Sequence, residues 1–154
     1  MENEGGVKKF SVQDGPFPRS AALFRIAAVL KIADEIEAVV TVSDVYSHAH
    51  VDVAKSQVIQ LLKEWPMFFN RHSDENGPKR DDWIRLSSVG YDYFTPQRCV
   101  SEGGVRPNYM DAAKVMFDQI DTMKAEGTWT QSVDEPHEKW SRACTHVFDE
   151  SLLD

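Results

Sequence analysis

The stretch from Val42 to Phe94 decides the fold, and it reads VSDVYSHAHVDVAKSQVIQLLKEWPMFFNRHSDENGPKRDDWIRLSSVGYDYF. A helix is predicted over residues 54–65, because apolar side chains recur there at intervals of three and four. A shorter helix is predicted over 44–50, where Ser43 can cap the first turn by accepting a backbone hydrogen bond. The stretch therefore begins with two short helices joined by a turn at residues 51 and 52.

Two β-prone runs follow these helices, at residues 67–69 and 83–86. The insert between them, residues 70–82, is polar and contains Gly77-Pro78. Two strands joined by a polar loop of this kind predict a β-hairpin. The fold class is therefore predicted to be mainly α with a small β-hairpin.

The flanking segments predict further helices and a division of the chain. Good helix formers fill residues 20–38, and a β-branched run at 39–42 predicts a short strand. After Phe94, two more helical patterns cover 108–126 and 135–152. Prolines and glycines interrupt the pattern elsewhere. The predicted units are a flexible arm at 1–18, a first domain at 19–95, a linker at 96–107 and a C-terminal helical segment at 108–154.

The order of these elements resembles the winged helix-turn-helix superfamily, particularly the MarR-like and PadR-like bacterial regulators. The segment VAKSQVIQLLKEW at 53–65 is similar to their recognition helix. The segment RLSSVGYDYF at 85–94 is similar to their strand-to-helix ending, often written L-T-x-x-G. Leu86, Ser87 and Gly90 occupy these motif positions, with serine in place of threonine. The turn between the two helices differs from the family because it contains no glycine.

This resemblance implies a DNA-binding transcriptional regulator. In such domains the recognition helix enters the major groove, and the hairpin, called the wing, contacts the DNA backbone. Glutamine can form paired hydrogen bonds with adenine, and basic side chains can neutralise phosphates. The predicted DNA-binding residues are Lys55, Ser56, Gln57, Gln60, Lys63, Arg71, His72, Lys79 and Arg80.

The C-terminal segment leaves three interpretations open. The apolar stripe of residues 108–126 can pack on the first domain, or it can form a homodimer, which a symmetric DNA site would favour. A protein-binding surface is the other alternative, because tryptophans often anchor interfaces. Its candidate residues are Trp129, Trp140, Asp134, Glu135 and Glu138. The alternative function is an acidic adaptor or inhibitor that uses a winged-helix fold to bind a protein partner.

The distribution of charge bears on this choice. The net charge of the chain is −8, which argues against contacts with phosphate. Residues 99–154 hold five basic and eleven acidic side chains, whereas residues 16–98 hold ten and eleven. The first domain is therefore nearly neutral, and a neutral domain can still present a basic face.

Other classes of site have weaker signals. No nucleophile with a neighbouring base and no phosphate-binding glycine loop is evident, so neither catalysis nor a cofactor is expected. His48, His50 and Asp52 resemble the start of the metallo-β-lactamase motif but lack its later ligands. A set of His137, Cys144 and His146 fits no zinc spacing.

The compartment expected for this chain is the cytoplasm. The sequence shows no apolar run of bilayer length and no signal-peptide pattern. Cys99 and Cys144 are expected to be reduced thiols, because two cysteines are weak evidence for a disulfide framework.

Overall fold

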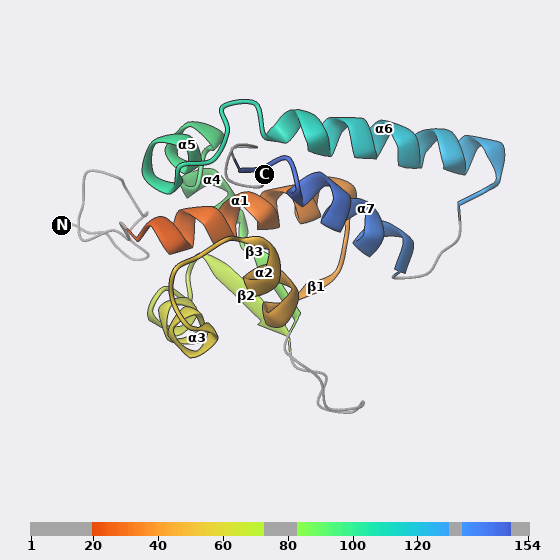
Figure 1. Ribbon diagram of the computed structural model, residues 1–154. Helices are drawn as coiled ribbons and strands as arrows, with labels where there is room; N and C mark the ends of the chain where they lie inside the picture. Colours follow the sequence, from red (N-terminus) through yellow and green to blue (C-terminus); the bar gives the residue numbers. More distant parts are fainter. Residues whose placement is uncertain (1–19, 73–82, 130–133, 149–154) are drawn as a thin grey trace, which may run out of the picture.

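A single helix, α1 (Ala21–Ile36), runs through the middle of the protein (Figure 1). The structure is a computed structural model that describes residues 20–72, 83–129 and 134–148. Twelve of the 16 residues of α1 are buried. A helix that is apolar on every side must be covered on every side, so α1 forms the centre of the core. Its bounds confirm the helix predicted over 20–38.

One side of α1 is covered by two helices and a three-stranded antiparallel sheet. The sheet has the order β1-β3-β2, with Val40 opposite Ile84 and Phe69 opposite Leu86. These four residues are buried, so the sheet contributes an apolar face to the core. In chain order the elements are β1 (Val40–Thr41), α2 (Val42–His48), α3 (Lys55–Glu64), β2 (Phe69–His72) and β3 (Trp83–Leu86).

The start of α2 and the turn after it differ from the predicted details. Thr41, rather than Ser43, caps α2: its hydroxyl accepts a hydrogen bond from Asp44 N at 3.1 Å, and the Asp44 carboxylate accepts one from Thr41 N. The threonine precedes the first helical residue, which is the position where capping is geometrically possible. After α2, His50 adopts a left-handed backbone with φ of 52°. His50 therefore makes the reversal for which a glycine is usual.

The segment after β3 places a glycine where no side chain fits. Ser87 caps helix α4 (Ser88–Tyr93) by accepting a hydrogen bond from Gly90 N at 3.0 Å, and its hydroxyl donates to Met67 O at 2.6 Å. A Cβ atom on Gly90 would lie 2.1 Å from Phe68 O. Glycine is required because α4 passes so close to the backbone leading into β2 that no Cβ atom fits between them.

Replacing Gly90 with alanine should destabilise the protein strongly. The clash involves backbone on both sides, so relief needs movement of α4 or β2, and we expect a loss of about 3 kcal/mol in unfolding free energy. Val89→Ala is the matched control, because Val89 lies on the same helix and is 41% exposed. Urea titration measures both. A loss below about 1 kcal/mol for Gly90→Ala would contradict this assignment.

The first part of the predicted linker is a helix. Residues 96–107 contain α5 (Pro96–Gly103), whose first turn is capped by Thr95 through Arg98 N at 3.1 Å. Proline at the first helical position needs no N–H partner, and Gly104 ends the helix with φ of 73°. The prolines and glycines interpreted as a linker are thus the start and end signals of a helix that packs on α1.

Two further helices complete the covering of α1 (Figure 1). They are α6 (Met110–Glu126) and α7 (Asp134–Cys144). Helix α7 is shorter than the helix predicted over 135–152, because a turn follows Cys144. Trp140 is fully buried, and its indole N–H donates to Val29 O at 2.8 Å. Trp140 therefore belongs to the core and cannot be the interface anchor that the sequence suggested.

A small polar cluster is enclosed beside α1. Lys31 is 2% exposed; its ammonium donates to Tyr91 O at 2.7 Å and lies 3.3 Å from the centre of the Tyr91 ring. Burial lowers the pKa of Lys31 below 10.5. Burial also raises the pKa of the nearby Cys99 thiol to about 11, so that thiol stays protonated at neutral pH.

The buried lysine should give the protein a measurable pH dependence. A lowered pKa means that the unfolded chain holds the proton more tightly, so the contribution of Lys31 to stability rises as the pH increases from its folded-state pKa to 10.5. Lys31→Met removes this contribution. Its unfolding free energy relative to wild type should therefore fall as the pH rises towards 10.5. The exposed Lys114→Met is the control, and an identical trend in both variants would contradict the prediction.

Candidate nucleic-acid interface

Helix α3 presents a stripe of polar side chains opposite its buried face. Val58 and Leu62, one turn apart, are its two buried residues. Because a helix turns by about 100° per residue, Ser56, Gln60 and Lys63 point away from that pair, and all three are exposed. We call these three residues the outer stripe. They bring an amide, a hydroxyl and an ammonium onto one line of about two helical turns.

Gln57 and Glu64 share one flank of the outer stripe. They lie seven residues apart and are both exposed, so they project in similar directions. A carboxylate repels a nearby phosphate, and Glu64 was not among the residues predicted from sequence. Glu64 also lies one turn from Gln60, so the acid borders both predicted glutamines.

Lys55 is held differently from the prediction that it faces outward. It is half-buried, and its ammonium donates a hydrogen bond to the Ser43 hydroxyl of α2. Two polar side chains from neighbouring helices thus meet at the start of α3. Lys63 remains the basic residue that projects fully from the described surface of α3.

The residues predicted for the hairpin are only partly described. The backbones of Arg71 and His72 lie in β2, opposite Ile84 and Trp83 of β3. Lys79 and Arg80 lie outside the described residues, as do the side chains of the two β2 residues. Strand β2 is the element that follows α3 in the chain, and it pairs with β3, which also pairs with β1.

Two side-chain hydrogen bonds hold the turn that leads into α3. The Arg25 guanidinium of α1 donates to His50 O in that turn and to Gly103 O, the latter at 2.6 Å. The Tyr46 hydroxyl donates to Val53 O at 2.8 Å. These contacts tie the turn before α3 to the central helix through Arg25 and to α2 through Tyr46, in both cases by a backbone carbonyl. The sequence offers no signal for them, because a backbone acceptor is the same at every residue.

A serine–histidine pair that the sequence did not predict joins α2 to α7. The Ser141 hydroxyl lies 2.9 Å from His48 Nε2, and His48 Nδ1 lies 2.8 Å from Asp44 O. A carbonyl only accepts, so the neutral ring donates through Nδ1 and accepts from Ser141 through Nε2. His137 Nε2 lies 3.2 Å from the Asp44 carboxylate. These contacts attach the C-terminal helix to the side of α1 that carries α3.

The histidines that were considered as metal ligands make contacts with aromatic rings. His48 faces Trp140, with ring centres 4.7 Å apart, while His50 faces Phe148 at 4.7 Å. The two histidines of the metallo-β-lactamase-like pattern therefore contact different neighbours. Burial raises the pKa of Cys144 well above its usual value. Among residues 20–72, 83–129 and 134–148, no cluster of three histidine, cysteine or carboxylate side chains is placed to hold a metal.

Comparisons with known proteins do not assign a function, so a function can be argued only from the geometry of the site. No protein-family model, curated protein or solved structure matches the chain. In the parts of the chain that the structure describes, no helix has the length and apolar character needed to cross a membrane.

Proposed function

We propose that the protein is a winged-helix regulator that binds double-stranded DNA through α3. The observation that carries the proposal is the outer stripe: only two residues of α3 are buried, and a polar line faces away from them. The order α1-β1-α2-α3-β2-β3, with sheet order β1-β3-β2, also resembles that superfamily. The Ser87 cap and the tight approach at Gly90 give its L-T-x-x-G-like ending a structural role.

The proposed binding mode follows from the chemistry of the stripe. Gln60 can donate to and accept from an adenine edge in the major groove, with Ser56 as an adaptable neighbour. Lys63 would contact a phosphate, as would Lys79 and Arg80 of the hairpin, which we propose to act as the wing. Base contacts would set the sequence preference, whereas phosphate contacts would set affinity for all sequences.

The direct test is a fluorescence-anisotropy titration with a pooled random duplex at several salt concentrations. Binding that weakens steeply with salt would support the proposal, because phosphate neutralisation releases counterions. Absence of binding at low salt would reject it. A duplex pool is the appropriate probe because the preferred sequence is unknown.

Variants of the two residue classes should then behave differently on a selected duplex. Gln57→Ala with Gln60→Ala should reduce the preference over random DNA by about 1–3 kcal/mol. Lys79→Gln with Arg80→Gln should weaken all duplexes alike and lower the salt slope by about 2. Lys114→Gln on α6 is the control for a lost charge. Equal and unselective losses from both pairs would contradict this division of roles.

We further propose that the protein pairs through α6, on the opposite side of α1 from α3 (Figure 1). Only Ala113, Met116 and Ile120 of this 17-residue helix are buried. Val115 is 50% exposed and Phe117 is 43% exposed. The two side chains flank the buried face on opposite sides, because they are two residues apart on the helix. A homodimer that covers both flanks of α6 would remove them from water and leave α3 of each copy available to a symmetric DNA site.

Introducing charge on α6 should therefore separate the two copies. Val115→Asp with Phe117→Asp should shift sedimentation equilibrium from dimer to monomer at micromolar concentrations, because unpaired carboxylates are costly to bury. Thr122→Asp adds one carboxylate at an exposed polar position of the helix and should leave the dimer intact. A wild-type protein that sediments as a monomer would refute pairing through α6.

A second candidate function is supported by the charge of the chain. The net charge is −8, and Glu64 lies on the flank of the outer stripe. An acidic adaptor that binds a protein through the same fold would show no salt-sensitive affinity for DNA. It would instead form a stable complex with a basic partner, and the duplex titration separates the two candidates.

A further inference from the structure

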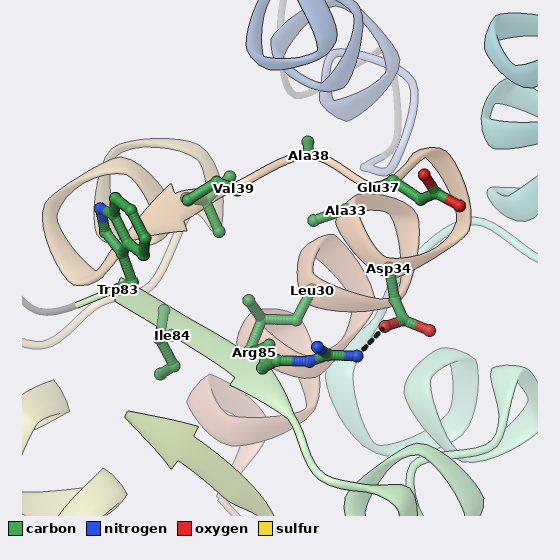
Figure 2. A pocket seen from close by; sticks show the side chains of 10 residues that line it. Leu30, Ala33, Asp34, Glu37, Ala38, Val39, Trp83, Ile84 and Arg85 are labelled. Atoms are coloured by element: carbon green, nitrogen blue, oxygen red, sulfur yellow. Dashed lines mark hydrogen bonds and ion pairs between the residues drawn. The ribbon is translucent and has the colours of Figure 1, made fainter. Parts of the chain in front are cut away.

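A pocket of about 290 Å³ lies where the end of α1 meets the edge of the sheet (Figure 2). Its floor consists of buried aliphatic side chains, including Leu30 and Ala33. Val39 and Trp83 form one wall and are 39% and 42% exposed. Sites that hold small ligands begin at roughly 300 Å³ and are mainly apolar with a few polar groups. The pocket therefore suits a ligand of about one ring and a short chain.

The side opposite Trp83 is negatively charged. Figure 2 shows Asp34 and Glu37 on that side, with Arg85 reaching Asp34. The guanidinium lies 3.3 Å from the Asp34 carboxylate and neutralises it. Within the described residues, the Glu37 carboxylate has no hydrogen-bond or ion-pair partner. Among the described residues, the exposed Glu37 carboxylate is therefore a negative charge without a countercharge at the rim of a mainly apolar pocket.

Glu37 is also unfavourable for the local structure. It ends α1 with a left-handed backbone, φ 59° and ψ 38°, which glycine adopts without steric cost. The last turn of α1 has no basic residue, although the carbonyl end of a helix attracts cations and repels carboxylates. Two local preferences are thus violated at one residue that lines a pocket. Such violations concentrate at functional sites.

We propose that this pocket binds a small arylalkylamine, with its ring against Trp83 and Val39 and its ammonium between Glu37 and Asp34. The ring would cover apolar surface that is otherwise exposed on Trp83 and Val39. The ammonium would supply the countercharge that Glu37 and the end of α1 lack. This site lies at the end of α1 and does not depend on DNA binding by α3.

The test uses three probes of similar size and different charge: 3-phenylpropylammonium, 3-phenylpropan-1-ol and 3-phenylpropanoate. Titrations of the full chain are followed by amide ¹H–¹⁵N NMR shifts and by calorimetry. The expected result is saturable binding of the ammonium, weaker binding of the alcohol and none of the carboxylate. The largest shifts should fall at residues 37–40 and 83–85, which line the pocket.

Two variants separate the charge from the apolar wall. Glu37→Gln should weaken the ammonium about threefold and leave the alcohol unchanged, as expected for loss of one exposed charge pair. Trp83→Thr places a residue of high strand propensity at this position of β3 and should weaken both probes about tenfold. Glu64→Gln on α3 is the matched control for the loss of a carboxylate, and its affinity for the ammonium should equal that of wild type.

Several outcomes would overturn the proposal. Equal affinity for all three probes, no saturation, or shifts confined to other residues would reject an amine site at this pocket. Binding of a lysine-containing peptide without binding of the free ammonium would assign the pocket to a protein partner instead. If Glu37→Gln and Glu64→Gln weakened the ammonium equally, Glu37 would act only through the net charge of the protein and not as a direct contact.

Discussion

Removal of the apolar surface of α1 from water is the requirement on which the other contacts depend. Twelve of its residues are buried, so one sheet and several helices must each supply an apolar face to cover it. The polar atoms enclosed with it need partners, which Tyr91 O supplies for Lys31. Arg25 on the same helix reaches the turn before α3. The central helix thus sets the position of the helix that carries the outer stripe.

Covering a central helix from several sides leaves the covering elements with distinct outer faces. Helix α3 contributes two buried residues and turns its outer stripe to solvent, whereas α6 contributes three and leaves Val115 and Phe117 exposed. Figure 1 places these helices on opposite sides of α1. The separation allows one face to bind DNA and the other a second copy, as proposed. The Ser141–His48 bond links the two sides through α7 and α2.

Local signals in the sequence predicted local structure well. Apolar spacing predicted α3, and the bounds of β3 agree with the predicted run at 83–86. Hydrogen bonds between residues far apart in the sequence were missed, such as those that Arg25 and Ser141 make with remote residues. Pro96 and Gly104 were interpreted as breaks, although the same residue types begin and end helices. Trp140 shows that residue type alone cannot separate a core position from an interface.

Amide hydrogen exchange of the full chain, with and without a random duplex at low salt, tests the central claim most directly. Exchange reports which backbone segments are covered or stabilised by a ligand. If α3 and its supporting turn form the DNA interface, the duplex should slow exchange across 50–64 and leave 110–126 unchanged. Protection confined to α6, or no protection anywhere despite measurable binding, would contradict the assignment of the interface to α3.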